Sequence, residues 1–406
     1  MLARLVPDMK KLIKNIAVLS ICQGLVMTNG AILITASSLV GYTLATQKTL
    51  ATLPVSTAMI GTLIGTIPAS LWMRRIGRRF GFMTGAAFGI MGGMIASSAI
   101  WIADFWLFCL GTAFLGIYNA FGQYYRFAAA DSTNEDFKSR AISLVMAGGL
   151  MAAFLGPASA GWTKDLLDPL TFLGTYLSIV ILAALAILIL IPLDISGLSP
   201  NDRSHSGRSL INIARQPAFL VAMTAAMIGY GVMSLVMTAT PLAMVSHGHT
   251  FSNATIVIQW HIVGMFGPSF FTGHLIRRFG VLNVMLAGSI FLCIATTFSV
   301  LGTDFINYWI GLFSLGLGWN FLFIGGTTLL TECHTESEKS KVQALNDFFV
   351  FGTVALASLG AGTLLHLFGW TILNLGALPF IAFTSMATVW LALHRYHTST
   401  NRDIGQ

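Results

Sequence analysis

Polar side chains recur at helical spacing inside one apolar stretch, residues 105–130. Asn119, Gln123 and Arg126 stand at positions i, i+4 and i+7, which places them on one face of a helix. Amide and guanidinium groups bind ligands through hydrogen bonds and charge. We therefore interpret this stripe as a binding face; the alternative is hydrogen bonding between packed helices. For Arg126, about one turn from the end of the stretch, snorkelling to the membrane surface is a second alternative.

Three other apolar stretches contribute side chains of the same kinds. Polar groups inside a membrane face the bundle interior or a water-filled cavity. A cavity lined by amides and aromatic rings, with one arginine near its base, suits a neutral or anionic organic molecule of modest size. It argues against cationic drugs, since no carboxylate lies near the middle of these stretches. To this cavity we assign Gln23, Asn29, Tyr118, Asn119, Gln123, Arg126, Tyr230, Trp319 and Asn320.

His261 is the one histidine well inside an apolar stretch, beside Gln259 and Trp260. Imidazole exchanges a proton near neutral pH, which suits a proton carrier. We regard His261 as a candidate for proton coupling; the alternative is a packed, hydrogen-bonding histidine. His247 and His249 form a two-histidine pattern with no third ligand nearby in the sequence, so we expect no metal site.

Composition sets the class of protein. The 406 residues are 55% hydrophobic and 9% charged, with a mean hydropathy of +0.78, which leaves too little polar surface for a soluble domain. The net charge is +7, but the basic residues lie in short loops, which indicates orientation in a membrane and not binding of nucleic acid. The enzyme motifs H-E-x-x-H and G-x-S-x-G and the nucleotide loop G-x-x-x-x-G-K-[ST] do not occur. We expect neither an enzyme nor a cofactor.

The polar residues are carried by apolar runs long enough to cross a bilayer core of about 30 Å. In lipid each run must be helical, because a helix satisfies its own backbone hydrogen bonds. The sequence thus predicts an all-α membrane protein with a first half at 1–192, a cytoplasmic linker at 193–215 and a second half at 216–406. The twelve predicted spans are 15–43, 51–73, 80–101, 105–130, 141–162, 170–192, 216–244, 253–275, 281–301, 305–331, 343–366 and 371–394.

Charge predicts the orientation of these spans. If the N-terminus is cytoplasmic, 20 of the 22 lysines and arginines fall on the cytoplasmic side, all but Lys48 and Lys164. Cytoplasmic loops carry an excess of basic residues. We therefore expect both termini in the cytoplasm and the protein in the inner membrane.

The two halves repeat one another. The basic loop Arg74–Arg79 after the second span returns as Arg277–Gly280 after the eighth, with Gly77 and Gly280 at matching positions. Glycine supplies the backbone freedom that a tight reversal needs. The repeat predicts two six-helix pseudo-repeats with their cavity between them. Further matches, at an offset of 200 or 201, pair Asp104 with Asp304, Asn119 with Asn320, and Asp131 with Glu332.

Over its whole length the chain resembles a major facilitator superfamily transporter. The family's signature after the second span is G-x-x-x-D-R-x-G-R-[KR]. It is matched here by Arg75, Gly77, Arg78 and Arg79, while Ser70 replaces the first glycine and Arg74 stands where the aspartate should be. The second copy keeps Gly273, Arg278 and Gly280, again with an arginine, Arg277, at the aspartate position. The helix-kinking pair Gly156-Pro157 resembles part of the family's antiporter motif, whose earlier glycines are replaced by Ser143 and Ala152.

The missing aspartate changes the expected mechanism. The resemblance implies that this acid holds the cytoplasmic side closed by meeting the eleventh span. Here we hypothesise a swapped latch from Arg74 to Asp347, supported by Asp131 near Arg78 and by Glu332 near Arg278. The alternative is that Arg74 orients its loop and Asp347 caps a helix start. The latch set is Arg74, Arg75, Gly77, Arg78, Asp131, Arg277, Arg278, Glu332 and Asp347.

These observations favour a secondary transporter that works by alternating access on a small neutral or anionic organic molecule. The pair Gly156-Pro157 favours proton-linked efflux. The alternatives are a proton-linked or facilitative uptake permease and, more distantly, a membrane sensor that transports nothing. The expected partners are a small-molecule substrate, protons and the lipid bilayer, with no nucleic acid. We expect a monomer, since two six-span halves complete a pathway.

Overall fold

The computed structural model of the protein describes residues 2–133, 141, 144–146, 148–195, 208–335 and 338–404. Within these ranges every regular element is a helix. A chain that is 55% hydrophobic needs this, because only helices and closed barrels satisfy their backbone groups in lipid. The predicted all-α membrane fold is confirmed.

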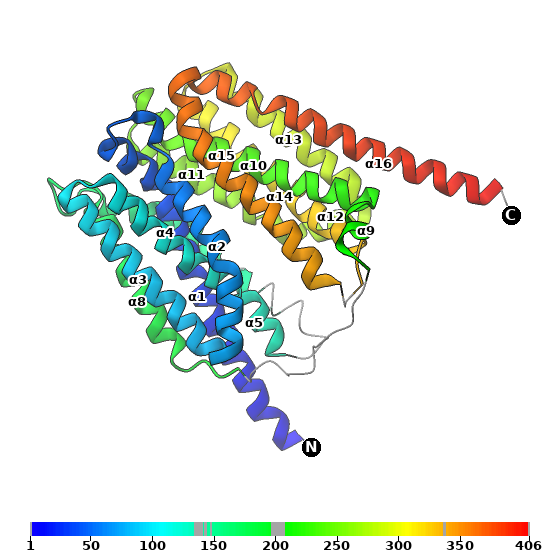
Figure 1. Ribbon diagram of the computed structural model, residues 1–406, viewed down its shortest axis with the longest axis horizontal. Coiled ribbons are helices and arrows are strands. Elements are labelled where there is room, and N and C mark those ends of the chain that lie inside the picture. Colours follow the sequence, from blue (N-terminus) through cyan, green and yellow to red (C-terminus); the bar gives the residue numbers. More distant parts are fainter. Residues whose placement is uncertain are drawn as a thin grey trace. The chain divides into compact units, whose positions relative to one another are not determined.

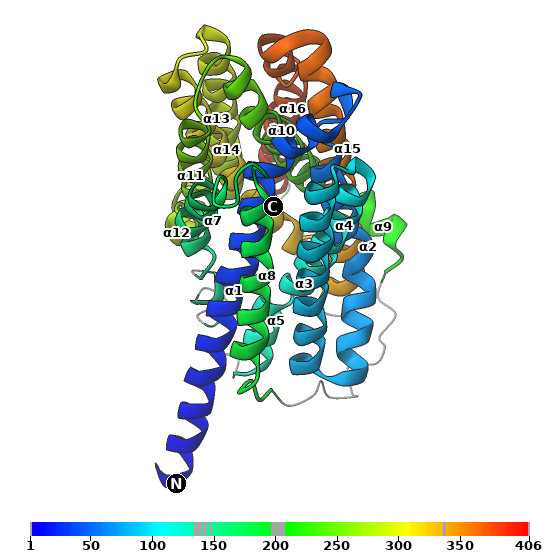
Figure 2. The same cartoon turned by 90° about the vertical axis from the view of Figure 1, so that its left-hand side faces the viewer.

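The helices group into two compact units, each of which is described by itself. The first unit comprises Met1–Asp202 with the short segment Thr250–Gln259, which the predicted second half included. In this unit α3 and α8 run side by side (Figures 1 and 2). Its helices are α1 (Leu2–Leu44), the short 3-10 helix η1 (Lys48–Leu50), α2 (Leu53–Ile76), α3 (Arg78–Ile102), α4 (Phe105–Gly122), α5 (Tyr125–Asp131), α7 (Leu150–Thr163) and α8 (Leu173–Leu190).

The second unit comprises Arg203–His249 with Trp260–Gln406. In this unit α10 packs against α14 and α15, and α13 packs against α14. The helices that contribute to it are α9 (Leu210–Ala214), α10 (Pro217–Ser246), α11 (Phe251–Phe266), α12 (Ser269–Phe279), α13 (Val281–Leu301), α14 (Phe305–Thr331), α15 (Lys339–Leu375) and α16 (Leu378–Ile404).

The number of membrane spans differs from the prediction of twelve. In the described part of the chain, ten helices are long and apolar enough to cross a bilayer, or up to eleven if the bent pair α11 and α12 is one span. One of the ten, Lys341–Tyr396, has 56 residues and covers most of α15 and part of α16, which are two helices. A single straight helix of that length would be about 84 Å long, more than twice a bilayer core. Twelve spans therefore stay a prediction.

Glycines let the helices of the first unit approach closely. A Cβ on Gly61 of α2 would collide with the carbonyl oxygen of Ala113 on α4, and one on Gly116 of α4 would collide with that of Ala58 on α2. Just before α7, Gly148 has no room for a Cβ because the carbonyl oxygen of Ser20 on α1 is against it. Small residues at such contacts are what brings helices together in lipid. These contacts fix α1 and α4, which carry the predicted polar residues.

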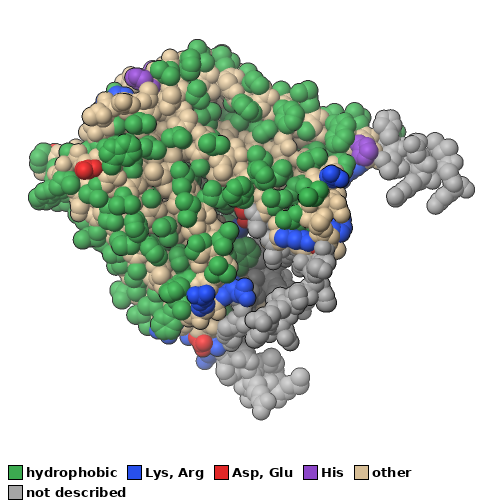
Figure 3. Space-filling view, in the orientation of Figure 1, with side chains coloured by type: hydrophobic (Ala, Val, Ile, Leu, Met, Phe, Trp, Pro, Cys, Tyr) green, Lys and Arg blue, Asp and Glu red, His purple; other side chains and the backbone are tan. Residues whose placement is uncertain are grey.

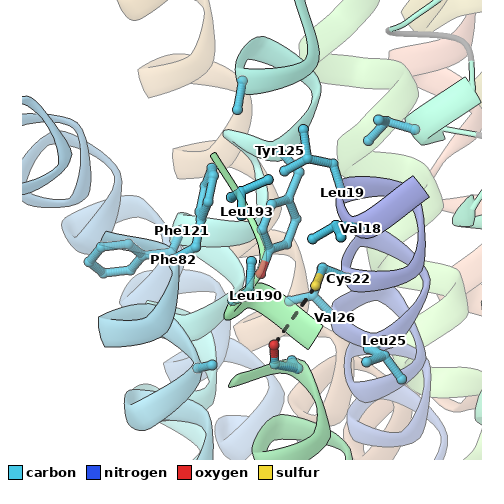
Figure 4. Packing of buried hydrophobic residues seen from close by; sticks show 14 of the residues in the cluster. Val18, Leu19, Cys22, Leu25, Val26, Phe82, Phe121, Tyr125, Leu190 and Leu193 are labelled. Atoms are coloured by element: carbon cyan, nitrogen blue, oxygen red, sulfur yellow. Dashed lines mark hydrogen bonds between the residues drawn. The ribbon is translucent and has the colours of Figure 1, made fainter. Parts of the chain in front are cut away.

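A buried core near the ends of α1, α3, α4 and α8 holds the first unit together. Figure 4 shows α1 contributing Val18, Leu19, Cys22, Leu25 and Val26 to this core. The Cys22 thiol donates to the carbonyl oxygen of Ala186 over 3.9 Å. The rings of Phe82 and Tyr125 lie 4.4 Å apart, centroid to centroid. Large side chains thus lock the helix positions that glycines make possible.

The outward faces of the helices are hydrophobic, as a lipid-facing surface must be. Hydrophobic side chains cover most of the face drawn in Figure 3, with lysines and arginines in small groups. Large apolar residues that would be buried in a soluble protein are exposed here, for example Ile67, Trp162 and Leu356. Exposed apolar area on this scale marks a surface that contacts something other than water.

Candidate functional site

The first unit buries two amides on α1. Gln23 is 4% exposed and Asn29 is 5% exposed. Neither side-chain atom of Asn29 that can form hydrogen bonds has a partner within the described ranges. A buried amide without partners carries a desolvation cost of about 1–3 kcal/mol. A ligand that bonds Asn29 would recover that cost, which supports its place in the predicted cavity.

The predicted stripe of span 4 crosses a local turn between α4 and α5. Asn119 lies on α4, Gln123 at its C-cap and Arg126 on α5, and all three are half-buried. Gln123 keeps helical angles, with φ −58° and ψ −20°, and its N–H donates to the Asn119 carbonyl over 3.1 Å. The Arg126 guanidinium lies 4.9 Å from the centroid of the Phe127 ring. The sequence predicted one continuous span here, and Phe105–Ala129 is one span by length and hydropathy, with a local turn at Gln123 and Tyr124.

The contacts of Asn119 and Tyr118 differ sharply. Asn119 Nδ2 donates to Thr62 Oγ1 on α2 over a long 3.4 Å. Tyr118 is 1% exposed, and its ring stands where a Cβ on Gly89 of α3 would be. This placement gives Tyr118 a packing role between α3 and α4, whereas Asn119 keeps most of its hydrogen-bonding capacity.

In the second unit Asn320 holds a broken span together. Asn320 is fully buried on α14 and donates to the Met265 carbonyl over 2.6 Å and to Ser269 Oγ over 2.8 Å. It accepts from Thr272 Oγ1 over 2.7 Å. Its partners lie on either side of the 42° bend between α11 and α12. The amide of Asn320 thus supports this bend, and its predicted place in the cavity wall stays a prediction.

Five aromatic rings from four helices meet in the second unit. Trp319 on α14 stacks on Phe323 with centroids 5.0 Å apart and meets Tyr230 of α10 edge to face at 5.2 Å. Phe266 of α11 lies 5.7 Å from Trp319, and Phe351 of α15 lies 6.1 Å from Tyr230. Trp319 is 5% exposed and the other four rings are half-buried. We call these five residues the aromatic cluster.

His261 is fully buried on α11, against α14. Its Nδ1 lies 2.7 Å from the Leu312 carbonyl oxygen, which fixes Nδ1 as the donor. The second ring nitrogen, Nε2, is buried with no hydrogen-bond partner in the described part of the chain. The structure therefore shows the packed histidine of the alternative interpretation, with one nitrogen still able to accept a proton. Its part in proton coupling stays a prediction.

The basic loops turn at their glycines. Gly77 joins α2 to α3 with φ +86°, and Gly280 joins α12 to α13 with φ +86°. The arginines just before each glycine are exposed, namely Arg74, Arg75, Arg277 and Arg278. The side chain of Asp131, the predicted partner of Arg78, lies outside the described residues. These loops have the backbone form that the sequence predicts.

The acids of the predicted latch have other neighbours. Glu332 Oε2 accepts from Arg395 of α16 over 2.7 Å rather than from Arg278. Asp347 Oδ1 accepts from its neighbour Asn346 over 3.3 Å. Because Arg74 belongs to the first unit and Asp347 to the second, the swapped latch would join the two units, and it stays a prediction.

The pair Gly156-Pro157 lies within α7 and packs on α1. A Cβ on Gly156 would collide with the Cβ of Ala31, and the Thr28 carbonyl is also close. Helix α7 continues through Pro157 to Thr163. The pair thus serves a close contact between two helices, which also accounts for its occurrence without any antiporter function.

Sequence reasoning missed an ion pair near the end of the linker, between the half-exposed side chain of Arg208 and the buried carboxylate of Glu338. Arg208 donates to Glu338 through its backbone N–H over 2.7 Å, through Nε over 3.0 Å and through Nη2 over 2.8 Å. Glu338 is 1% exposed and also accepts from the Thr335 N–H. These bonds from Arg208 and Thr335 hold the pKa of Glu338 well below its ordinary value. The two residues are 130 positions apart, and no spacing pattern in the sequence connects them.

At the other end of the linker the ion pair is more exposed and therefore weaker. Asp194 accepts from Lys11 over 2.8 Å, and its backbone exchanges hydrogen bonds with the Asn15 amide. The Lys11 ammonium lowers the pKa of the Asp194 carboxyl. This pair is largely exposed, so water screens it.

Known proteins resemble the chain along most of its length. The family model described as Major Facilitator Superfamily matches residues 19–332. The chain is 44% identical over 371 residues to the riboflavin transporter RfnT of Brucella anthropi, which covers 91% of this chain and 93% of that protein. It is 25% identical over 374 residues to the uncharacterized MFS-type transporter YddS of Bacillus subtilis, which covers 88% of this chain and 86% of that one.

A solved structure shares the fold. The crystal structure of a D-xylose-proton symporter superimposes with a TM-score of 0.69 and covers 92% of this chain and 96% of its own, at 14% sequence identity. At that identity the likeness concerns the fold alone. The sequence matches, the helical membrane architecture and this superposition agree. The chain belongs to the Major Facilitator Superfamily of multi-pass membrane transporters.

Proposed function

We propose that this secondary transporter carries riboflavin or a closely related flavin. The observation that carries the proposal is the 44% identity, over 91% of the chain, to a protein named as a riboflavin transporter. The sequence predicts a small substrate that is neutral or anionic, and the proposal selects the neutral class.

The chemistry of the polar and aromatic residues supports a flavin. Riboflavin joins a flat, uncharged aromatic ring system with carbonyl oxygens to a chain of hydroxyl groups. Aromatic rings favour stacking on flat ligands, and amides both donate to and accept from hydroxyls. The first unit supplies Asn29, Asn119 and Gln123, and the second unit supplies the aromatic cluster. Each unit thus offers groups that match one part of this ligand.

A counterflow assay tests the substrate without assuming a direction. Purified protein in liposomes preloaded with riboflavin should accumulate labelled riboflavin from outside, because exchange needs no driving force. Gln123→Ala should slow this exchange. Asn283→Ala should leave it unchanged, because this exposed amide bonds the Phe279 carbonyl at the end of the preceding helix. Stable wild-type protein that exchanges no riboflavin would refute the proposal and favour the sensor that transports nothing.

Direction and proton coupling are read from the same liposomes. An imposed pH gradient should drive net riboflavin movement if transport is proton-linked. Movement in the direction of proton flow indicates symport, as in uptake, and movement against it indicates antiport, as in efflux. His261→Gln keeps a hydrogen-bond donor for the Leu312 carbonyl but removes the titratable ring. If His261 couples protons, this variant keeps counterflow and loses gradient-driven transport.

A further inference from the structure

The buried indole of Trp319 has a donor without an acceptor. Its Nε1–H is buried, with no hydrogen-bond partner in the described part of the chain. Buried donors in native proteins are normally paired, and each exception calls for an explanation. The three rings that contact Trp319, those of Tyr230, Phe266 and Phe323, are each half-buried.

The arrangement of the rings is suited to a flat ligand. Tyr230 and Phe266 meet the Trp319 ring edge to face, at interplanar angles of 73° and 70°. Phe323 lies nearly parallel to it at 11°. Rings in two roughly perpendicular orientations offer both a stacking surface and an edge. A ligand whose ring edge carries a carbonyl oxygen can stack on the half-buried rings and accept from the indole N–H.

The neighbouring residue holds Trp319 in place. Asn320 is fixed by three hydrogen bonds across the bend between α11 and α12. Such a fixed neighbour orients the α14 backbone and therefore the direction of the Trp319 side chain. The half-buried rings packed on the indole would have to shift when a ligand enters.

We propose that the aromatic cluster of the second unit binds the flavin ring system and that Trp319 Nε1–H donates to a carbonyl oxygen at its pyrimidine edge. The inference rests on the proposed flavin transport and names the group that recognises the ring. It assigns Trp319 the role of a specificity-determining residue: flat aromatic molecules without a carbonyl at that edge leave the N–H unpaired and bind more weakly.

Trp370 provides a matched control. It is 4% exposed, belongs to the same unit, and its Nε1–H also has no partner among the described residues. It packs on Tyr308, at 5.0 Å between centroids, and not on the aromatic cluster. Changing either tryptophan to phenylalanine removes a buried, unpaired N–H and keeps a ring. Only Trp319→Phe should affect flavin recognition.

The test is flavin binding to the full-length protein in detergent, measured by the loss of flavin fluorescence that stacking on aromatic rings causes. Riboflavin and lumiflavin, which keeps the ring system but lacks the hydroxyl chain, are the probes. We expect Trp319→Phe to weaken both by about tenfold, the effect of one hydrogen bond to a buried donor, and Trp370→Phe to change neither. Unchanged binding of both flavins to Trp319→Phe would overturn the inference while leaving flavin transport intact.

A change in the ligand tests the same bond without relying on the folding of a variant. Flavins with sulfur in place of one pyrimidine carbonyl oxygen keep the ring shape but accept hydrogen bonds poorly. Two such thioflavins exist, one for each pyrimidine carbonyl. Wild-type protein should bind one of the two several-fold more weakly than riboflavin, and Trp319→Phe should bind both thioflavins equally. Equal binding of both thioflavins to wild type would overturn the inference. Wild-type protein that binds no flavin at all would overturn the proposed function itself.

Discussion

Two asparagines at matching positions of the repeat have opposite surroundings. Asn119 in the first unit is half-buried and makes one long hydrogen bond of 3.4 Å to Thr62. Asn320 in the second unit is fully buried and makes three bonds of 2.6–2.8 Å. The same side chain on the same repeated span therefore supports structure in one unit and stays available to a ligand in the other. Sequence symmetry does not imply symmetry of function.

The physical cause lies in the partner helix. Span 8 breaks at Gly267 and Pro268, and Asn320 donates to the Met265 carbonyl just before the break. Its counterpart, α2, runs as one helix from Leu53 to Ile76. There Thr62 donates its hydroxyl to the Ala58 and Gly116 carbonyls, both at 3.0 Å, and can only accept from Asn119. A broken helix requires a side-chain partner, and an intact helix does not.

The largest difference is expected when each asparagine is truncated. Asn320→Ala removes three hydrogen bonds in the membrane interior and should lower the free energy of unfolding by about 2–5 kcal/mol. Asn119→Ala removes one long bond and should cost less than about 1 kcal/mol. Denaturant unfolding in detergent measures both. Equal losses would show that the two residues serve the same structural role.

Ligand binding should show the reverse order. Asn119→Ala should weaken riboflavin binding although it lowers the free energy of unfolding only slightly, because it removes an amide that is open to the ligand. If Asn119→Ala binds riboflavin as wild type does, and only the less stable Asn320→Ala binds it more weakly, Asn119 serves packing alone.

At the two basic loops the units should behave alike. Gly77 and Gly280 have φ +86° with ψ 163° and 150°, a region that is essentially limited to glycine. Alanine at either position should lower stability by about 1–3 kcal/mol, although a Cβ would meet no atom within 4 Å. Gly273→Ala is the control, because its site is equally open and has no positive φ. A loss confined to one loop would mean that the two reversals are not equivalent.

The two ends of the linker should differ in their response to acid. The folded-state pKa values of Glu338 and Asp194 are both lowered, so each carboxylate stabilises the fold at neutral pH. That contribution is lost as pH falls through the ordinary carboxyl range, near 4, and on through the lowered folded-state pKa. We expect Glu338→Gln to flatten the acid dependence of the unfolding midpoint more than Asp194→Asn, since Glu338 is buried and Asp194 is exposed. Similar flattening by both variants would contradict this order.

The smallest effect is expected at the pair between Glu332 and Arg395. The two side chains are 45% and 40% exposed, and a pair of this kind contributes below about 1 kcal/mol. Glu332→Gln should leave thermal stability nearly unchanged at moderate salt. A loss as large as that of Asn320→Ala would point to a role of Glu332 beyond this ion pair.

Most of the fold could be predicted from hydropathy and from the positions of turn-forming glycines. The apolar runs mark the helices, and Gly77 and Gly280 mark reversals, because lipid allows few backbone conformations. The local turn at Gln123 and Tyr124 within span 4 was not predicted, since no proline marks it. The site was predicted as a set of residue types: Asn119 and Trp319 remain candidates for ligand contact, while Tyr118 and Asn320 proved to be engaged in packing.

By itself the sequence determined that this is a helical membrane transporter with repeated halves, because composition and period act locally along the chain. The tertiary structure decided which polar residues are engaged in packing and which remain available. It also brought Arg208 to Glu338 and gathered the aromatic cluster from four helices. The physical reason is that hydrogen bonds and ring contacts depend on which backbone carbonyls and which faces meet across helices, and spacing within one helix carries no information about its neighbour.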